Sequence, residues 1–309
     1  MTSLRLVFAG SPQAAVPSLR VLAASNHEVT AVITRADSPH GRRGVLTPTP
    51  VADVAVELGI RTIRTNRLVG QATETVEELA PDLGVIVAYG GLVREPLLST
   101  PRLGWINLHF SLLPRWRGAA PVQRAIIAGD DVTGATVFQL VPELDAGDVF
   151  GRMTEPIGRL QTAGNLLDSL AASGAELLLR VVDALADGTA RAEVQQGDVT
   201  LAPKLTLGDG QIDWTLSAEQ VSAHVRGVTP EPGAFTTIDG SRLKVIGAVI
   251  ARDTVRLAPG ALSLEGKHVV IGTATQPLQL LVVHPAGRKQ MDAASWWRGR
   301  PSDADMRAS

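Results

Sequence analysis

Apolar runs alternate with amphipathic stretches over the first half of the chain. Residues 4–9, 29–34 and 83–88 are mainly apolar, which is typical of strands buried on both faces. Residues 14–24 and 51–58 have apolar positions at helical spacing and lie between these strands. The alternation of strand and helix predicts an α/β domain with a mostly parallel sheet covered on both faces.

The pattern changes in the last third of the chain. Residues 163–185 have helical composition, and Asp187, Gly188 and Thr189 end that helix. A polar segment without periodicity follows and predicts a linker. Beyond it, short β-rich runs separated by turn signals favour a small β-barrel; these runs are residues 243–250, 268–272 and 278–283. The predicted boundaries are 1–189 for the first domain, 190–206 for the linker and 207–309 for the second domain.

Composition narrows the classes of function. A chain of 309 residues that is 45% hydrophobic is long enough for two ordinary cores. The net charge of −2 gives no overall basic field. Cysteine is absent and the six histidines are scattered, so we expect no disulfide, thiolate nucleophile or metal site. Without a signal-like or membrane-spanning apolar run, we expect a cytoplasmic protein.

The candidate chemistry lies in residues 107–118, N-L-H-F-S-L-L-P-R-W-R-G. Asn107 and His109 are two apart in a predicted strand, so their side chains share one face and together suit a developing oxyanion. Asp145 follows a second predicted strand, residues 136–141, within the run L-D-A-G-D. A carboxylate against the imidazole would orient it and favour its charged form. The alternative is structural, because an isolated Asn, His or Asp-Gly turn is common in folds.

A dinucleotide cofactor is disfavoured. The first strand ends in F-A-G-S-P-Q-A-A, which lacks G-x-G-x-x-G and has a proline near the position of the second glycine. We interpret Gly10 as a turn that lets a helix begin close to the strand.

The run S-L-L-P-R-W-R-G-A-A-P-V-Q-R-A-I, with N-L-H before it and L-D-A-G-D after it, resembles the methionyl-tRNA formyltransferase family, among the enzymes that use 10-formyltetrahydrofolate. Residues 6–19, 87–90 (V-A-Y-G) and 226–235 (R-G-V-T-P-E-P-G-A-F) extend the resemblance over nearly the whole chain. It implies a Rossmann-like formyltransferase domain followed by an OB-like domain that binds tRNA.

The resemblance also implies the reaction. The formyl group of 10-formyltetrahydrofolate would pass to the amino group of methionyl initiator tRNA, with no metal. Asn107 and a protonated His109 would stabilise charge on the formyl oxygen, and Asp145 would orient His109 and assist removal of the amine proton. Backbone around residues 87–92 would bind the pterin. The family's folate-binding run matches this chain at Ser111, Leu112, Leu113 and Pro114, so the resemblance implies that these residues bind the folate.

Contacts to tRNA are implied in two places. Residues 34–50 form a long connection, and the matching family loop engages the tRNA acceptor end. The chain keeps Arg42 in that loop, which makes it the predicted tRNA contact, but has Arg43, Gly44 and Val45 where the family often has Gly-Lys-Lys. A solvated loop is the alternative.

From Leu207 onward eleven basic residues face ten acidic ones, a formal charge of +1. A local basic group there suits phosphate contacts or an ordinary charged rim; it comprises Arg242, Lys244, Arg252 and Arg256. Trp296 and Trp297 are expected to pack a helix onto the barrel.

Three other functions compete. Formyltransferases for glycinamide ribonucleotide or an amino-sugar nucleotide would use the same Asn, His and Asp. The first are single-domain proteins, so the region from Leu207 counts against them, and residues 226–235 with the Arg42 loop favour tRNA over a sugar nucleotide. A non-catalytic RNA-binding protein would leave the Asn107, His109 and Asp145 pattern without a purpose. We expect a monomer.

Overall fold

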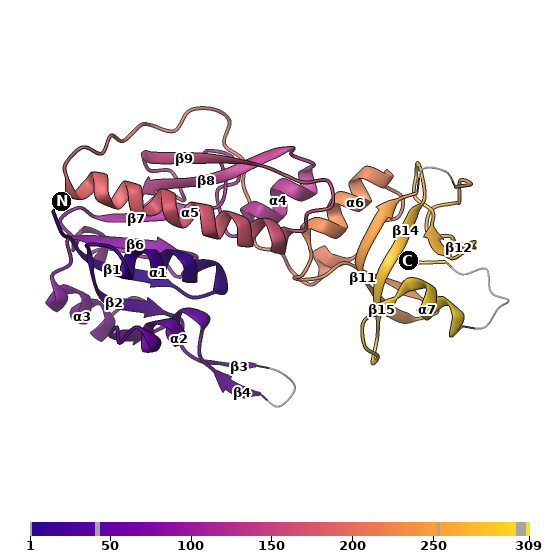
Figure 1. The fold of residues 1–309 in the computed structure, drawn as a ribbon, viewed down its shortest axis with the longest axis horizontal. Helices are drawn as coiled ribbons and strands as arrows, with labels where there is room; N and C mark the ends of the chain where they lie inside the picture. Colours follow the sequence, from indigo (N-terminus) through magenta and orange to yellow (C-terminus); the bar gives the residue numbers. More distant parts are fainter. Residues whose placement is uncertain (1, 41–43, 252–253, 301–306) are drawn as a thin grey trace. The chain divides into compact units, whose positions relative to one another are not determined.

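The computed structural model describes residues 2–40, 44–251, 254–300 and 307–309, and it divides into two compact units (Figure 1). The first unit comprises Met1–Ala119, Thr133–Glu155 and Leu167–Ala202. The second comprises Ala120–Val132, Pro156–Leu166 and Pro203–Ser309. The chain therefore enters the second unit twice before it stays there. In the described part of the chain, no helix is long and apolar enough to cross a membrane.

The first unit is built on a seven-stranded sheet with the order β5-β2-β1-β6-β7-β8-β9 (Figure 1). Pairing is parallel from β5 to β7, and β8 runs antiparallel to β7. The strands are β1 (Arg5–Gly10), β2 (Glu28–Thr34), β5 (Thr62–Arg64), β6 (Leu83–Val87), β7 (Trp105–His109), β8 (Val132–Gln139) and β9 (Val149–Pro156). This confirms the predicted mostly parallel sheet.

Helices cover both faces of this sheet. On one face, Val76 of α3 belongs to the same buried cluster as Val7 and Trp105. On the other, Gly174 of α5 lies so close to Leu108 of β7 that a Cβ there would be 3.2 Å from it. Because side chains alternate along a strand, Asn107 and His109 point away from α5. The helices are η1 (Gln13–Ala15), α1 (Val16–Ala23), α2 (Pro50–Glu57), α3 (Gln71–Leu79), η2 (Leu97–Ser99) and α5 (Ala163–Ala186).

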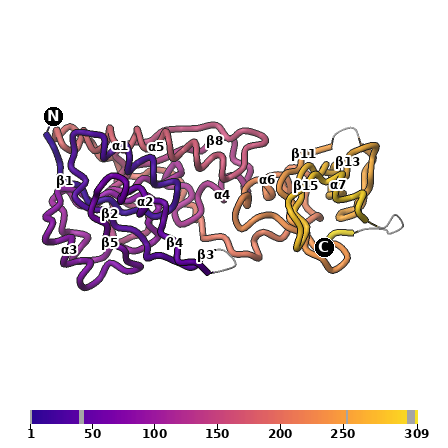
Figure 2. Tube along the Cα trace, turned by 60° about the horizontal axis from the view of Figure 1, so that its bottom comes forward, coloured from indigo at the N-terminus to yellow at the C-terminus, as the bar shows by residue number. Residues whose placement is uncertain are grey.

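The long connection after β2 contains two short strands, β3 (Ser38–His40) and β4 (Val45–Thr47), paired antiparallel. Both views show this hairpin projecting from the main sheet of its unit (Figures 1 and 2). Arg42 and Arg43 lie outside the described residues. The tRNA contact of Arg42 stays a prediction.

The second unit contains an antiparallel sheet with the order β10-β11-β14-β13-β12, and β15 pairs with β14. The strands are β10 (Phe235–Ile238), β11 (Ser241–Ile250), β12 (Leu262–Glu265), β13 (His268–Ile271), β14 (Leu278–Pro285) and β15 (Met291–Asp292). Trp296 of α7 (Ala293–Arg298) is buried in the core of this unit with Trp214 and Val245, and Trp297 packs against that core. The predicted β-rich region and the packing role of these tryptophans are confirmed.

The run at residues 226–235 begins at the end of α6 (Ala218–Gly227), and α6 packs against α4 (Pro121–Ala128). A Cβ at Gly227 would lie 3.0 Å from the Gln123 carbonyl oxygen, so only glycine permits this close crossing. Arg226 Nη1 donates to the Gln161 carbonyl oxygen at 3.1 Å. Helix α6 was not predicted from the sequence, although Ser217 and Gln220 form a capping box at its start.

The segment predicted as a linker divides at Ala202. Residues up to Ala202 group with the first unit, and Pro203 onward with the second. Glu193 and Val149 exchange two backbone hydrogen bonds of 2.8 and 3.0 Å, and Leu201 forms a β-bridge with Arg117. Residues 193–202 therefore pair with other backbone of the first unit.

Candidate active site

Strand β7 presents Asn107 and His109 from the interior of the sheet. Asn107 pairs with Ile86 of β6 and Phe138 of β8, and His109 pairs with Thr136. Only 6% of His109 is exposed, whereas Asn107 is half-buried. The predicted strand is confirmed, and its alternation puts both side chains on one face.

Three contacts fix the His109 ring. Its Nε2 donates to the Trp116 carbonyl oxygen at 2.8 Å, and its edge meets the Phe138 ring at 88°, with centroids 6.4 Å apart. Its Nδ1 lies 3.9 Å from Asp145 Oδ2, which is beyond hydrogen-bond distance. The Trp116 carbonyl therefore sets which nitrogen keeps a proton, and Nδ1 faces the carboxylate.

Burial dominates the ionisation of His109. It lowers the pKa of the imidazole below its usual value, while the Asp145 charge and the Trp116 hydrogen bond act in the opposite direction. The neutral ring, with its proton on Nε2 and a lone pair on Nδ1, is therefore favoured at pH 7. This departs from the protonated His109 expected from the sequence, because sequence does not show how completely the ring is desolvated.

Asp145 is brought to the site by the turn that follows β8. Its backbone is left-handed, with a φ of 46°, and its side chain is 12% exposed. Oδ2 accepts a hydrogen bond of 2.8 Å from the Gly118 backbone N–H. Gly118 itself has a φ of 125°, and a Cβ there would lie 2.8 Å from the Ala202 carbonyl oxygen. Glycine is thus required at the residue that anchors the carboxylate.

The run Ser111, Leu112, Leu113 and Pro114 forms a fixed turn beside this pair. Ser111 Oγ donates to the Arg115 carbonyl oxygen at 2.6 Å. Thr136 Oγ1 donates to the Ser111 carbonyl oxygen at 2.6 Å and accepts from Leu113 N at 3.3 Å. Leu113 is buried against Phe138 and Val149, and Leu112 packs over Gly134 of β8. The leucines therefore anchor the turn.

The loop after β6 is also held by hydrogen bonds. Ser11 Oγ donates to the Tyr89 carbonyl oxygen at 3.3 Å, and Arg35 Nη1 donates to that of Gly90 at 3.0 Å. Ala88 has a positive φ of 49°. Among the described residues, His, Asp and Glu side chains form no group of three that could hold a metal ion.

Sequence reasoning missed the residues that brace this site. Thr136 was visible only as a β-branched strand residue, and Gln195 and Thr200 were assigned to a linker. Gln195 and Thr200 contact the loops around Asp145 and Trp116. The contacts join residues 23 to 84 positions apart. Local pattern gives no signal for such pairs.

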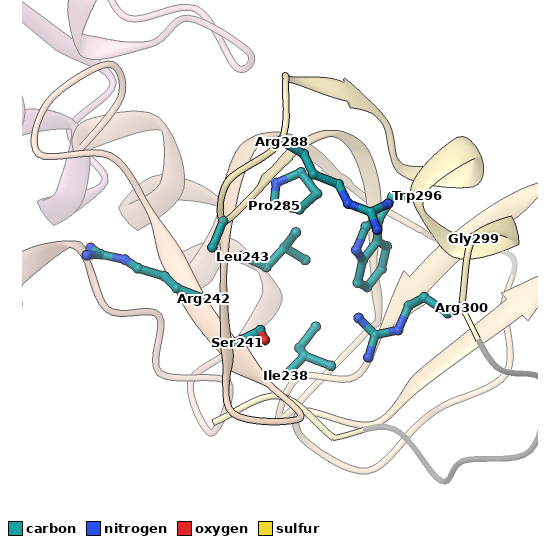
Figure 3. A pocket seen from close by; sticks show the side chains of 10 residues that line it. Ile238, Ser241, Arg242, Leu243, Pro285, Arg288, Trp296, Gly299 and Arg300 are labelled. Carbon is teal, nitrogen blue, oxygen red and sulfur yellow. The ribbon is translucent and has the colours of Figure 1, made fainter. Parts of the chain in front are cut away.

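A cavity of about 320 Å³ in the second unit is bordered by arginines (Figure 3). Arg288 and Arg300 extend toward Trp296, whereas Arg242 points away from the cavity and lies 3.4 Å above the centre of the Phe235 ring. Arg300 pairs with Asp239. Arg242 and Lys244 of the predicted basic group lie on β11, and Arg252 is outside the described residues.

Comparison with known proteins gives concordant results over nearly the whole chain. Residues 4–182 match the model of the formyl transferase family, and residues 204–301 match that of the formyl transferase C-terminal domain. The methionyl-tRNA formyltransferase of Clavibacter sepedonicus is 60% identical over 296 residues, which cover 96% of this chain and 97% of that protein. The methionyl-tRNA formyltransferase of Leifsonia xyli is 60% identical over 97% of this chain and 99% of its own.

A solved structure shares the fold at much lower identity. It is the N-formyltransferase from Helicobacter canadensis in complex with folinic acid and dTDP-3-aminofucose, with a TM-score of 0.68 and 16% identity over 89% of this chain and 98% of that one. The two family models and the two close relatives lead to one conclusion: the chain belongs to the formyl transferase family, among the methionyl-tRNA formyltransferases.

Proposed function

We propose that this protein transfers the formyl group of 10-formyltetrahydrofolate to the amino group of methionyl initiator tRNA. The observation that supports the tRNA substrate most strongly is 60% identity, over nearly full length, to relatives named methionyl-tRNA formyltransferase. The N-formyltransferase solved in complex with dTDP-3-aminofucose is only 16% identical. The alternative acceptors, an amino-sugar nucleotide and glycinamide ribonucleotide, are therefore disfavoured.

In the proposed reaction, the methionyl amine attacks the formyl carbon and negative charge develops on the formyl oxygen. The Asn107 amide donates a hydrogen bond to that oxygen, an interaction whose loss typically costs about 10²- to 10³-fold in rate. Its half-buried position on β7 suits this role, since a donor held by a central strand needs little reorganisation.

His109 and Asp145 handle the proton of the attacking amine. Neutral His109 accepts that proton at Nδ1, while Nε2 remains hydrogen-bonded to the Trp116 carbonyl. The imidazolium so formed is stabilised by the Asp145 charge, 3.9 Å away. The C–N bond to the new amide forms first and gives the oxyanion; its collapse then breaks the bond to folate N10, and N10 takes up a proton.

The turn of Ser111, Leu112, Leu113 and Pro114 would bind the folate through its backbone. Its leucines pack into the protein, and Thr136 holds Ser111 and Leu113, so the turn presents a rigid edge. Backbone of residues 87–92 would bind the pterin. No metal has a role in this proposal.

Binding of tRNA is assigned to Arg42 and to the second unit. Arg288, beside Trp296 in the cavity of Figure 3, suits a phosphate contact that is independent of base sequence. We assign catalysis to residues 1–189 and tRNA binding to the OB-like region 207–309; the contacts of residues 193–202 add them to the catalytic side. We also propose that the protein is a monomer and is located in the cytoplasm.

A comparison of acceptor substrates tests the proposal directly. The protein is incubated with radiolabelled 10-formyltetrahydrofolate and, separately, methionyl initiator tRNA, glycinamide ribonucleotide or a dTDP-amino sugar. We expect label in the methionyl-tRNA alone. Labelling of either small amine at a comparable kcat/KM would refute the acceptor, and no labelling of any amine would refute formyl transfer.

A further inference from the structure

We infer that residues 193–202, here called the strap, position the catalytic loops, and that Gln195 is a positioning residue for Asp145. The inference rests on the proposed function, since it concerns the geometry of the Asp145 and His109 pair. The strap follows α5 in the chain and belongs to the first unit, as do all the residues that it contacts below.

The Gln195 amide ties two loops together. Its Nε2 donates to the Asp145 carbonyl oxygen at 2.8 Å and to that of Gly147 at 2.9 Å. Its Oε1 accepts from Arg117 Nη2 at 2.6 Å. One side chain thus spans the loop that holds Asp145 and the loop that supplies the Trp116 carbonyl to His109.

Asp145 needs such support because its backbone is unfavourable. A non-glycine residue at a φ of 46° is in the left-handed region, which residues with a Cβ rarely adopt. The hydrogen bonds from Gln195 hold the carbonyl groups on both sides of Ala146, while Gly118 holds the carboxylate. Without Gln195, the backbone that aims Asp145 at His109 would lose two of its donors.

Thr200 acts on the other loop. Its Oγ1 accepts from Trp116 N at 2.9 Å, and its carbonyl oxygen accepts from Arg117 N at 2.9 Å. Ala202 N then donates to the Arg117 carbonyl oxygen at 2.7 Å. Trp116 also has a positive φ, 62°, and its carbonyl is the acceptor for His109. The strap therefore fixes both partners of the imidazole.

The burial pattern of the segment agrees with this role. Between residues 191 and 200 only Gln195 and Thr200 are half-buried, and the remaining eight are exposed. The two inward side chains are the ones that contact the catalytic loops. A flexible tether would not need one amide side chain that forms hydrogen bonds with two backbone carbonyl groups and one guanidinium.

Two substitutions separate positioning from simple tethering. Gln195→Glu keeps an oxygen for Arg117 and adds charge to that pair, but it removes the donor to Asp145 and Gly147. Gln195→Met keeps the shape and removes every hydrogen bond. The matched control is Gln196→Met, at the exposed neighbouring glutamine.

The full-length variants are assayed for kcat and KM with 10-formyltetrahydrofolate and methionyl initiator tRNA, and their thermal unfolding is measured. We expect kcat to fall about 10- to 100-fold in both Gln195 variants, since a misplacement near 1 Å can cost about 10²-fold. KM should change less than about twofold and the unfolding midpoint should stay above the assay temperature, because binding backbone and core packing are untouched. Gln196→Met should match the unaltered protein.

The inference would be overturned if kcat is unchanged in Gln195→Glu. It would also be overturned if only KM changes, or if activity is lost only because the variant is unfolded at the assay temperature. Asp145→Asn separates this failure from that of the proposed function: if it retains full activity, the catalytic assignment itself is wrong. If Asp145→Asn is impaired and Gln195→Glu is not, only the strap is refuted. In the Asp145→Asn background, Gln195→Met should add less than about a twofold loss, because it acts through Asp145.

Discussion

The catalytic loops of the first unit and the arginine-bordered cavity of the second use polar side chains in opposite ways. In the loops the groups are buried or half-buried and neutral or singly charged, and each is held by a backbone partner 7 to 27 residues away in sequence; Trp116 O, Gly118 N and Ser111 O are such partners. Around the cavity Arg242 and Arg288 are exposed and Arg300 is half-buried; Arg242 stacks on an aromatic ring and Arg300 pairs with an acid.

This difference predicts how strongly catalysis and tRNA binding each respond to single substitutions and to salt. Buried hydrogen bonds in a low-dielectric site are strong and depend steeply on geometry, so single changes should cost orders of magnitude and respond little to salt. Exposed charges are screened over about 8 Å at physiological ionic strength, so each contributes little and loses its effect as salt rises.

The largest effect is expected for Asn107→Ala. Loss of the amide removes a donor to the oxyanion, so the single-turnover rate should fall about 10²- to 10³-fold. Folate affinity should change little and the defect should be the same at low and high salt. The measurement is rapid-quench formylation under saturating substrates, with Asn165→Ala, at an exposed asparagine of α5, as the matched control. A wild-type rate would remove Asn107 from the oxyanion site.

Asp145→Asn should lower the rate by about 10²-fold and also move its pH dependence. Activity requires neutral His109, so it is lost as pH falls through the pKa of that ring, and burial lowers this pKa from its usual value. Asp145 raises the His109 pKa toward its usual value, and removing its charge lets the pKa drop further. The acid limb of the single-turnover profile should therefore move to lower pH. A move to higher pH would contradict the proposed base.

Local pattern in the sequence predicted most strands and the long helix of the first unit. The apolar runs located β1, β2, β6, β7 and α5, because burial on both faces leaves a continuous signal. Alternation in β7 put Asn107 and His109 on one face. Helices α3 and α6 were missed, since each is short and mixes polar with apolar residues.

The sequence did not reveal which residues distant along the chain contact one another. Nothing in the composition of residues 121–128 indicates that α4 packs with α6 in the second unit. Residues 190–206 look like a linker because most of their side chains face solvent, although Gln195 and Thr200 point inward. The neutral state of His109 depends on desolvation by packing, which is also a property of the assembled fold.

The smallest effect is expected for Arg288→Gln in the cavity of Figure 3. If Arg288 contacts a phosphate, the KM for tRNA should rise by at most about fivefold at low salt, as an exposed charge contributes modestly. The logarithmic salt dependence of tRNA affinity should become shallower by about one unit, since one fewer counterion is released. Lys267→Gln, at an exposed lysine that does not line the cavity, controls for net charge alone.

An equal change in both variants would assign the effect to overall charge. A loss in kcat that salt does not alter would instead erase the contrast between the two units, because the cavity would then behave as the catalytic loops do.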